Sequence, residues 1–155
     1  MSNAAVAPQP ASGITGPVLL VVAGGAVSQA AIARTAELAA GAPVTVVGIE
    51  TSEAGRAKAA SHWPAQPEQV RRTVALAMSV LEDTGVMAMG HIVTGSPARA
   101  VARMARAGGA RVVILDSEAR GAGPAGLMAE LRRRMYGSGI IVLAETDRRG
   151  GWVSV

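Results

Sequence analysis

The sequence predicts an α/β fold, a single-domain, Rossmann-like, doubly wound parallel sheet of five strands, from three observations. Apolar runs without polar alternation, such as Val112–Leu115, are typical of strands that helices cover on both faces. Segments with helical spacing of apolar residues separate these runs, and helical crossovers of this kind join parallel strands. The 155 residues match one domain, which at this size buries about 70% of its unfolded surface.

The first half of the chain alternates two strands and two helices. The expected elements are a buried strand over residues 18–23, a helix over 28–40, a strand over 44–49 and a helix from Pro67 to about residue 84. Gly24 and Gly25 form a turn after the first strand, and Gly41 ends the first helix. Residues 50–66 form a long polar loop, which we expect at the surface.

The second half adds three strands and two helices. A strand over residues 86–93 is more polar and contains Gly90, as expected at the edge of a sheet. Ser96 caps the next helix, and Pro97 suits its first position because a missing N–H costs nothing there. The remaining elements are a strand over 112–115, a loop over 117–123, a helix that opens at Pro124 and a last strand over 140–143.

The domain is expected over residues 17–146, between a tail over residues 1–16 and a second tail over residues 147–155. Ser2-Asn3-Ala4 resembles an expression-vector remnant, and the first tail has neither the basic start nor the apolar segment of a secretory signal. No apolar run is long enough to cross a bilayer, and no cysteine is present for a disulfide, a thiolate nucleophile or a metal. We therefore expect a cytoplasmic protein with no membrane partner.

The basic residues are almost all arginine, and the net charge is +4. Arg99, Arg103 and Arg106 recur at helical spacing and form one basic stripe opposite an alanine face. Such a stripe is typical of a solvated helix face, and nucleic-acid binding would require the arginines to converge on one surface. Because only one tyrosine and two tryptophans are available to stack on bases, we do not expect a nucleic-acid partner.

No group of residues has the spacing of a catalytic or metal site. His62 and His91 each lack a second ligand nearby, and no serine lies in a nucleophile-elbow motif. Asp116 and Glu118 permit two interpretations, an acid–base pair or loop acids bonded to backbone N–H groups. We expect no catalytic residue, no metal and no enzyme activity.

Three segments together resemble the universal stress protein family over about residues 17–144. They are AELAAGAPVTVVGI, GSPARAVARMARAGGARVVIL with its Gly-x-Pro-Ala helix start, and SGIIVL at the closing strand. The resemblance implies the strand order 3-2-1-4-5 and a homodimer that pairs through the last strand. The dimer residues would be Ile140, Ile141, Val142 and Leu143, since an exposed apolar edge strand would otherwise aggregate.

The nucleotide-binding branch of that family carries Gly-x2-Gly-x9-Gly-(Ser/Thr) after the fourth strand and an Asp after the first. In this chain Gly24 stands at the Asp position, Asp116 at the first glycine, Ala119 at the second and Leu127 at the hydroxyl residue. A carboxylate at Asp116 would face phosphates, and at ~4 Å that repulsion costs about 4 kcal/mol at an effective dielectric constant near 20. The resemblance therefore implies a degenerate member without ATP binding.

The loop after the fourth strand nevertheless contains Gly121, Gly123 and Gly126, which either turn the chain or line a ligand. The candidate ligand-binding residues are Gly24, Gly25, Ile49, Asp116, Gly121, Gly123 and Gly126, with Ile49 as the apolar contact for a base. The sequence thus favours a stress-response regulatory or interaction module with an unidentified protein partner and no cofactor. The alternative is a protein that binds ATP or AMP, with slow ATP hydrolysis.

Overall fold

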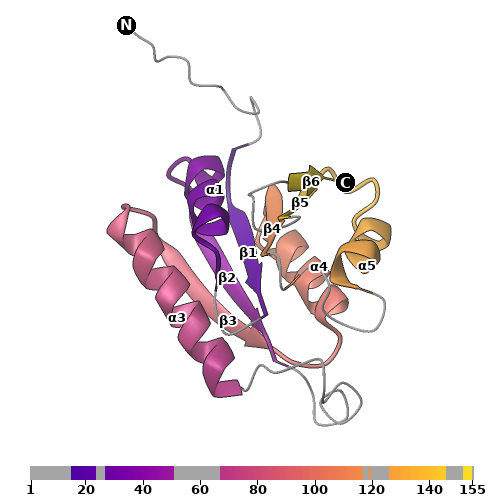
Figure 1. Ribbon diagram of the computed structural model, residues 1–155. Coiled ribbons are helices and arrows are strands. Elements are labelled where there is room, and N and C mark those ends of the chain that lie inside the picture. Colours follow the sequence, from indigo (N-terminus) through magenta and orange to yellow (C-terminus); the bar gives the residue numbers. More distant parts are fainter. Residues whose placement is uncertain are drawn as a thin grey trace, which may run out of the picture.

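The computed structural model describes residues 15–23, 27–50, 67–116, 119, 126–145 and 152–154. Within these residues one sheet lies between two layers of helices, with the strand order β3-β2-β1-β4-β5-β6 (Figure 1). The first five strands in sequence are parallel to one another and keep the order 3-2-1-4-5. The structure therefore confirms the predicted doubly wound sheet, and it places β3 at the predicted edge.

The observed elements lie within a few residues of the predicted ones. The strands are β1 (Val18–Val22), β2 (Val44–Ile49), β3 (Ala88–Val93), β4 (Val112–Leu115), β5 (Ile141–Glu145) and β6 (Trp152–Ser154). The helices are α1 (Gln29–Ala39), α3 (Pro67–Asp83), α4 (Pro97–Ala107) and α5 (Leu127–Arg134). Ser96 caps α4 as predicted, because its side chain accepts a hydrogen bond from the backbone N–H of Arg99 and Pro97 opens the helix.

The C-terminal end of the chain differs from the prediction. Residues 152–154, expected within a tail, form β6, which pairs antiparallel with β5 and places Trp152 opposite Glu145. The strand β5 itself runs two residues beyond the predicted end at Leu143. A three-residue strand is too short to show a periodic pattern, so only its pairing with a distant segment reveals it.

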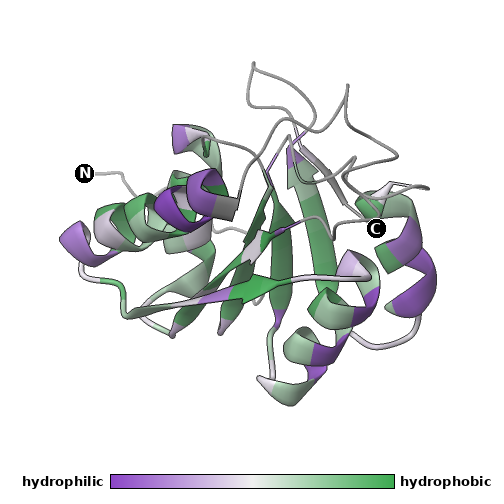
Figure 2. Cartoon of the chain, turned by 90° about the horizontal axis from the view of Figure 1, so that it is seen from below, coloured by the Kyte–Doolittle hydropathy of each residue, from purple (hydrophilic) through white to green (hydrophobic). Residues whose placement is uncertain are grey.

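Side chains alternate between the two faces of the sheet and build two separate cores. On β1, Leu19 and Val21 pack with α4 and α5, whereas Leu20 and Val22 pack with α1 and α3. Figure 2 shows the resulting layers, in which hydrophobic strands lie between helices that carry hydrophilic residues on their outer sides. The two covered faces explain why the central strands lack polar alternation.

Helix α3 packs closely on β2 because residue 48 has no side chain. A Cβ built on Gly48 would lie 2.6 Å from a methyl carbon of Val70 and 2.6 Å from one of Val74. Both valines are buried, and their branched side chains have few alternative rotamers in a helix. The glycine therefore sets the distance between this helix and the sheet.

We expect Gly48→Ala to lower the free energy of unfolding by about 1–3 kcal/mol, because the added methyl overfills the contact with α3. Urea denaturation measures this change. Gly90→Ala provides the comparison, since a Cβ there would meet the flexible Met78 sulfur at 2.6 Å and one Val74 methyl at 2.8 Å, whereas a Cβ at residue 48 would meet two valine methyls at 2.6 Å. The Gly90 variant should lose less stability, and an equal or greater loss would contradict this account of the packing.

Candidate functional site

The carboxyl ends of β1 and β4 meet at the point where the strand order reverses. The chain leaves β1 through α1 on one face of the sheet, and α4 leads into β4 from the other face. Open α/β sheets bind their ligands in the crevice beyond this switch point. The backbone N–H of Asp116, just after β4, donates to the carbonyl oxygen of Val21 at 3.0 Å, so Asp116 lies directly beside the end of β1.

Asp116 is directed at the start of α1. Its side chain is 1% exposed, and its Oδ1 accepts a hydrogen bond from the backbone N–H of Ser28 at 3.1 Å. Ser28 is the N-cap of α1, where unpaired N–H groups and the helix dipole favour a negative charge. The sequence left two interpretations of Asp116, an acid–base pair or a loop acid bonded to backbone N–H groups. The observed contact is of the second kind.

A second buried acid, Glu145, reaches the same residue and was missed in the sequence analysis. Glu145 is the last residue of β5 and is 2% exposed, and its Oε1 accepts a hydrogen bond from the Ser28 hydroxyl at 2.7 Å. The sequence signal that could have identified Glu145 is an acid at the end of an apolar run, the same pattern as Leu115-Asp116. The predicted strand ended at Leu143, so Glu145 was assigned to no element.

Ser28, Asp116 and Glu145, here called the Ser28 cluster, therefore close the start of α1. The Ser28 hydroxyl also accepts a hydrogen bond from the backbone N–H of Ala31 at 3.0 Å, so the hydroxyl is both donor and acceptor. The Ser28 side chain thus links the first turn of α1 to the end of β5. The backbone N–H of Ser28 links the same turn to Asp116, just after β4. Two of the protein's own carboxylates occupy the place where an anion would otherwise bind.

The C-terminal strand reinforces this arrangement. Trp152 in β6 lies under the guanidinium of Arg34 in α1, with 5.8 Å between the guanidinium carbon and the ring centroid. Such a cation–π contact contributes about 0.5–1 kcal/mol at an exposed site. The pairing of Trp152 with Glu145 therefore joins β6, β5 and α1 at the same end of the molecule.

The other predicted ligand residues are only partly described. Ile49 is the last residue of β2 and packs in the core shared with α4 and α5, where it is buried. Gly126 stands at the N-cap of α5 with a φ of 87°, a conformation that favours glycine. The remaining four candidates, Gly24, Gly25, Gly121 and Gly123, lie outside the described residues.

The predicted dimer strand has a mixed environment. Val142 is buried, whereas Ile140, Ile141 and Leu143 are half-buried. β5 lies between β4 and β6, and β6 pairs only with residues 143–145. Over the described part of the chain, the outer side of β5 at Ile141 and Val142 therefore has no strand partner.

The structure brings no metal-binding group together among the residues it describes. No three side chains of His, Cys, Asp or Glu gather there in an arrangement that could hold a metal ion. His91 is exposed on β3, while His62, Ser117 and Glu118 fall outside the described residues. No described helix is long and apolar enough to cross a membrane.

Solved structures of universal stress proteins share this architecture. A family protein from Burkholderia pseudomallei matches 87% of this chain and 98% of its own with a TM-score of 0.57 and 20% identity. A universal stress protein from Archaeoglobus fulgidus matches 77% of this chain and 87% of its own with a TM-score of 0.55 and 16% identity. The chain has the universal stress protein fold.

The universal stress protein fold alone does not decide the function. A bacterial class III photolyase from Agrobacterium tumefaciens also matches, over 92% of this chain but 27% of its own, with a TM-score of 0.54 and 22% identity. No family model matches the sequence, and no curated protein matches it. Function must therefore be argued from the sites that this chain places on the fold.

The Ser28 cluster makes a testable contribution to stability. We expect Ser28→Ala to lower the free energy of unfolding by about 1–3 kcal/mol, because it removes a helix cap and a donor to a buried carboxylate. Ser96→Ala is the matched control, since Ser96 caps α4 from an exposed position. That variant should lose only about 0.5 kcal/mol. Equal losses in urea denaturation would show that the cluster adds nothing beyond capping.

Proposed function

We propose that this protein is a stress-response regulatory module of universal stress protein fold that acts through protein contacts, without binding ATP or AMP at the carboxyl edge of the sheet and without catalysis. The observation that carries this proposal is the Ser28 cluster. The start of α1 at the switch point is occupied by the carboxylates of Asp116 and Glu145. The site that a phosphate would use is therefore filled by groups of the same charge.

Electrostatics and space both oppose a nucleotide at this edge. A phosphate at ~4 Å from one carboxylate would meet a repulsion of about 4 kcal/mol at an effective dielectric constant near 20, equal to roughly three orders of magnitude in affinity. Asp116 and Glu145 are almost fully buried, so neither can turn into solvent without breaking its bond to Ser28. The burial of Ile49 likewise leaves little apolar surface for a base.

Isothermal titration calorimetry with AMP and with ATP tests this proposal. We expect no saturable binding of AMP, because the described residues at the carboxyl edge offer its phosphate two carboxylates and its base a buried Ile49. Mass analysis of the purified protein should likewise find no retained nucleotide. A dissociation constant below the low-micromolar range for AMP, or for ATP in the Arg99→Gln/Arg103→Gln variant, would refute the proposal and favour the alternative, a nucleotide-binding stress protein in which the glycine loop holds the phosphates.

We also propose that the protein is a homodimer through the β5 side of the sheet. The support is the outer side of β5 at Ile141 and Val142, an apolar stretch with no strand partner within the described residues. Open strand edges of this kind pair readily with another chain. A second copy would cover this edge and, with it, the half-buried Ile140.

Light scattering or sedimentation velocity should give the mass of a dimer for the wild type. We expect Ile141→Lys to shift the protein toward monomer, since a charge in an apolar interface must be desolvated. Met87→Lys is the control because Met87 is exposed beside β3, at the opposite edge of the sheet. A monomeric wild type, or a dimer unaffected by Ile141→Lys, would refute the interface.

A further inference from the structure

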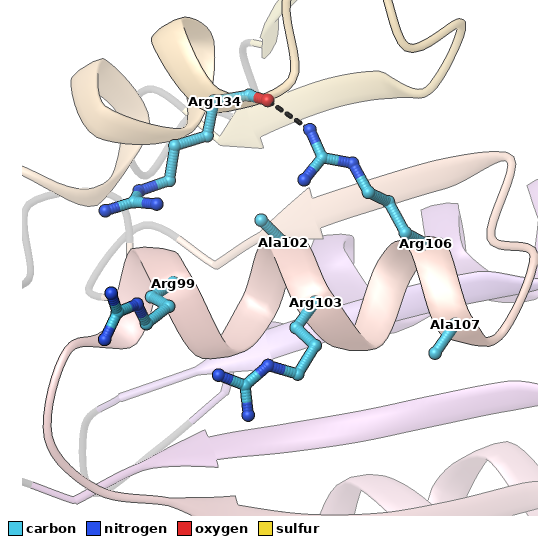
Figure 3. Close-up of a pocket in the computed structure, with 6 residues that line it drawn as sticks. All are labelled: Arg99, Ala102, Arg103, Arg106, Ala107 and Arg134. Atoms are coloured by element: carbon cyan, nitrogen blue, oxygen red, sulfur yellow. Dashed lines mark hydrogen bonds between the residues drawn. The ribbon is translucent and has the colours of Figure 1, made fainter.

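A cleft of about 500 Å³ lies between α4 and α5, on the face of the sheet away from α1 and α3. It is lined by Arg99, Ala102, Arg103, Arg106, Ala107 and Arg134 (Figure 3). Four of the six lining residues are arginines, and the other two are alanines whose small side chains leave the space open. The cleft is separate from the Ser28 cluster and plays no part in the function proposed above.

Four arginines line one cleft because two helices meet, although the Arg103 side chain points away from α5 (Figure 3). Three of them lie along α4 beside the buried Ala102, which lines the cleft with them. Arg134 comes from the last turn of α5, and its side chain extends back toward α4 (Figure 3). The sequence predicted a stripe on one helix, but the packing of α5 beside α4 turns that stripe into one wall of a cleft.

The positive charge in this cleft is not neutralised by the described part of the chain. None of its four arginines forms an ion pair there, and the two ion pairs present join Arg34 to Glu37 and Arg72 to Glu68. Those pairs lie on α1 and α3, across the sheet from the cleft. Four guanidinium groups with no carboxylate partner create a local field that favours an anion.

Arg106 is also held in place. Its Nη2 donates a hydrogen bond to the carbonyl oxygen of Arg134, in the last turn of α5. This contact ties the two helices together and places a cation at the negative end of the α5 dipole. A guanidinium carries five N–H donors, so four donors of Arg106 remain for a ligand.

We propose that this cleft binds a small, multiply phosphorylated anion. Guanidinium groups bind phosphate oxygens in pairs, which gives arginine sites both affinity and orientation. Arg99 and Arg106 are separated by about 10.5 Å along the helix axis, so an anion with several phosphates can contact both ends of the row of arginines. A volume near 500 Å³ lies within the range of roughly 300–1,000 Å³ that is typical of small-ligand sites.

A single nucleic-acid strand fits the cleft less well than a small anion. Single-strand sites combine a basic groove with aromatic side chains on which bases stack, and among the described residues no aromatic side chain lines this cleft. Tyr136 is 90% exposed nearby in sequence, but it lines a different hollow with Arg132 and Ile141. A cleft that offers guanidinium groups but no ring for base stacking favours recognition of phosphates alone.

Calorimetric titration with inorganic tripolyphosphate at about 150 mM salt tests the proposal. We expect saturable binding that the double variant Arg99→Gln/Arg103→Gln weakens about tenfold or more. The double variant Arg71→Gln/Arg72→Gln on α3 removes the same charge from exposed positions on the other face and should change the affinity less than twofold. Orthophosphate should bind at least about tenfold more weakly than tripolyphosphate.

Three outcomes would overturn the proposal. One is the absence of saturable tripolyphosphate binding, and another is an equal loss in both double variants, which would reflect net charge alone. The third is a single-stranded oligonucleotide that binds more tightly than tripolyphosphate and loses affinity in the α4 variant. ATP binding that the α4 variant abolishes would belong to this cleft, so the test stays separate from that of the carboxyl edge.

Discussion

The central strands of this sheet bury apolar side chains on both faces, and this requirement governs the rest of the molecule. A parallel sheet of this kind is stable only when helices cover it on both sides, because each face would otherwise expose a continuous apolar surface to water. Helices α1 and α3 cover one face, and α4 and α5 cover the other. The Ser28 cluster and the arginine cleft both follow from this arrangement of helices. The cluster lies at the strand ends, and the cleft lies between two of the covering helices.

At the strand ends, two buried carboxylates must be satisfied within the protein. The burial of Asp116 and Glu145 is tolerated there because the start of α1 supplies hydrogen-bond donors and a favourable dipole. Ser28 provides both contacts, one through its backbone and one through its hydroxyl. The same feature that makes a helix N-terminus suitable for a phosphate is thus used to hold the fold together.

The cleft between α4 and α5 shows the opposite situation, since its charged groups are positive and are not satisfied by the described residues. The arginines of this cleft are exposed and have no acidic partner in the described residues, so water and ions must compensate them. The two sites therefore differ in what they lack: the Ser28 cluster has its charges satisfied internally, whereas the cleft leaves its charges available. Since solved proteins as different as stress proteins and a photolyase share this arrangement of strands and helices, such differences carry the functional information.

The sequence by itself determined the five parallel strands, the helices and the caps, because apolar runs, helical spacing and capping residues are patterns among residues close in the chain. Largely apolar runs identified β2 and β4 at their observed bounds, and Ser96 with Pro97 identified the start of α4. Tertiary structure alone decided that Glu145 meets Ser28, 117 positions away, and that Arg134 faces Arg106, 28 positions away. Periodicity is local and says nothing of which distant elements become neighbours, so β6, the Ser28 cluster and the arginine cleft emerged only when the chain was folded.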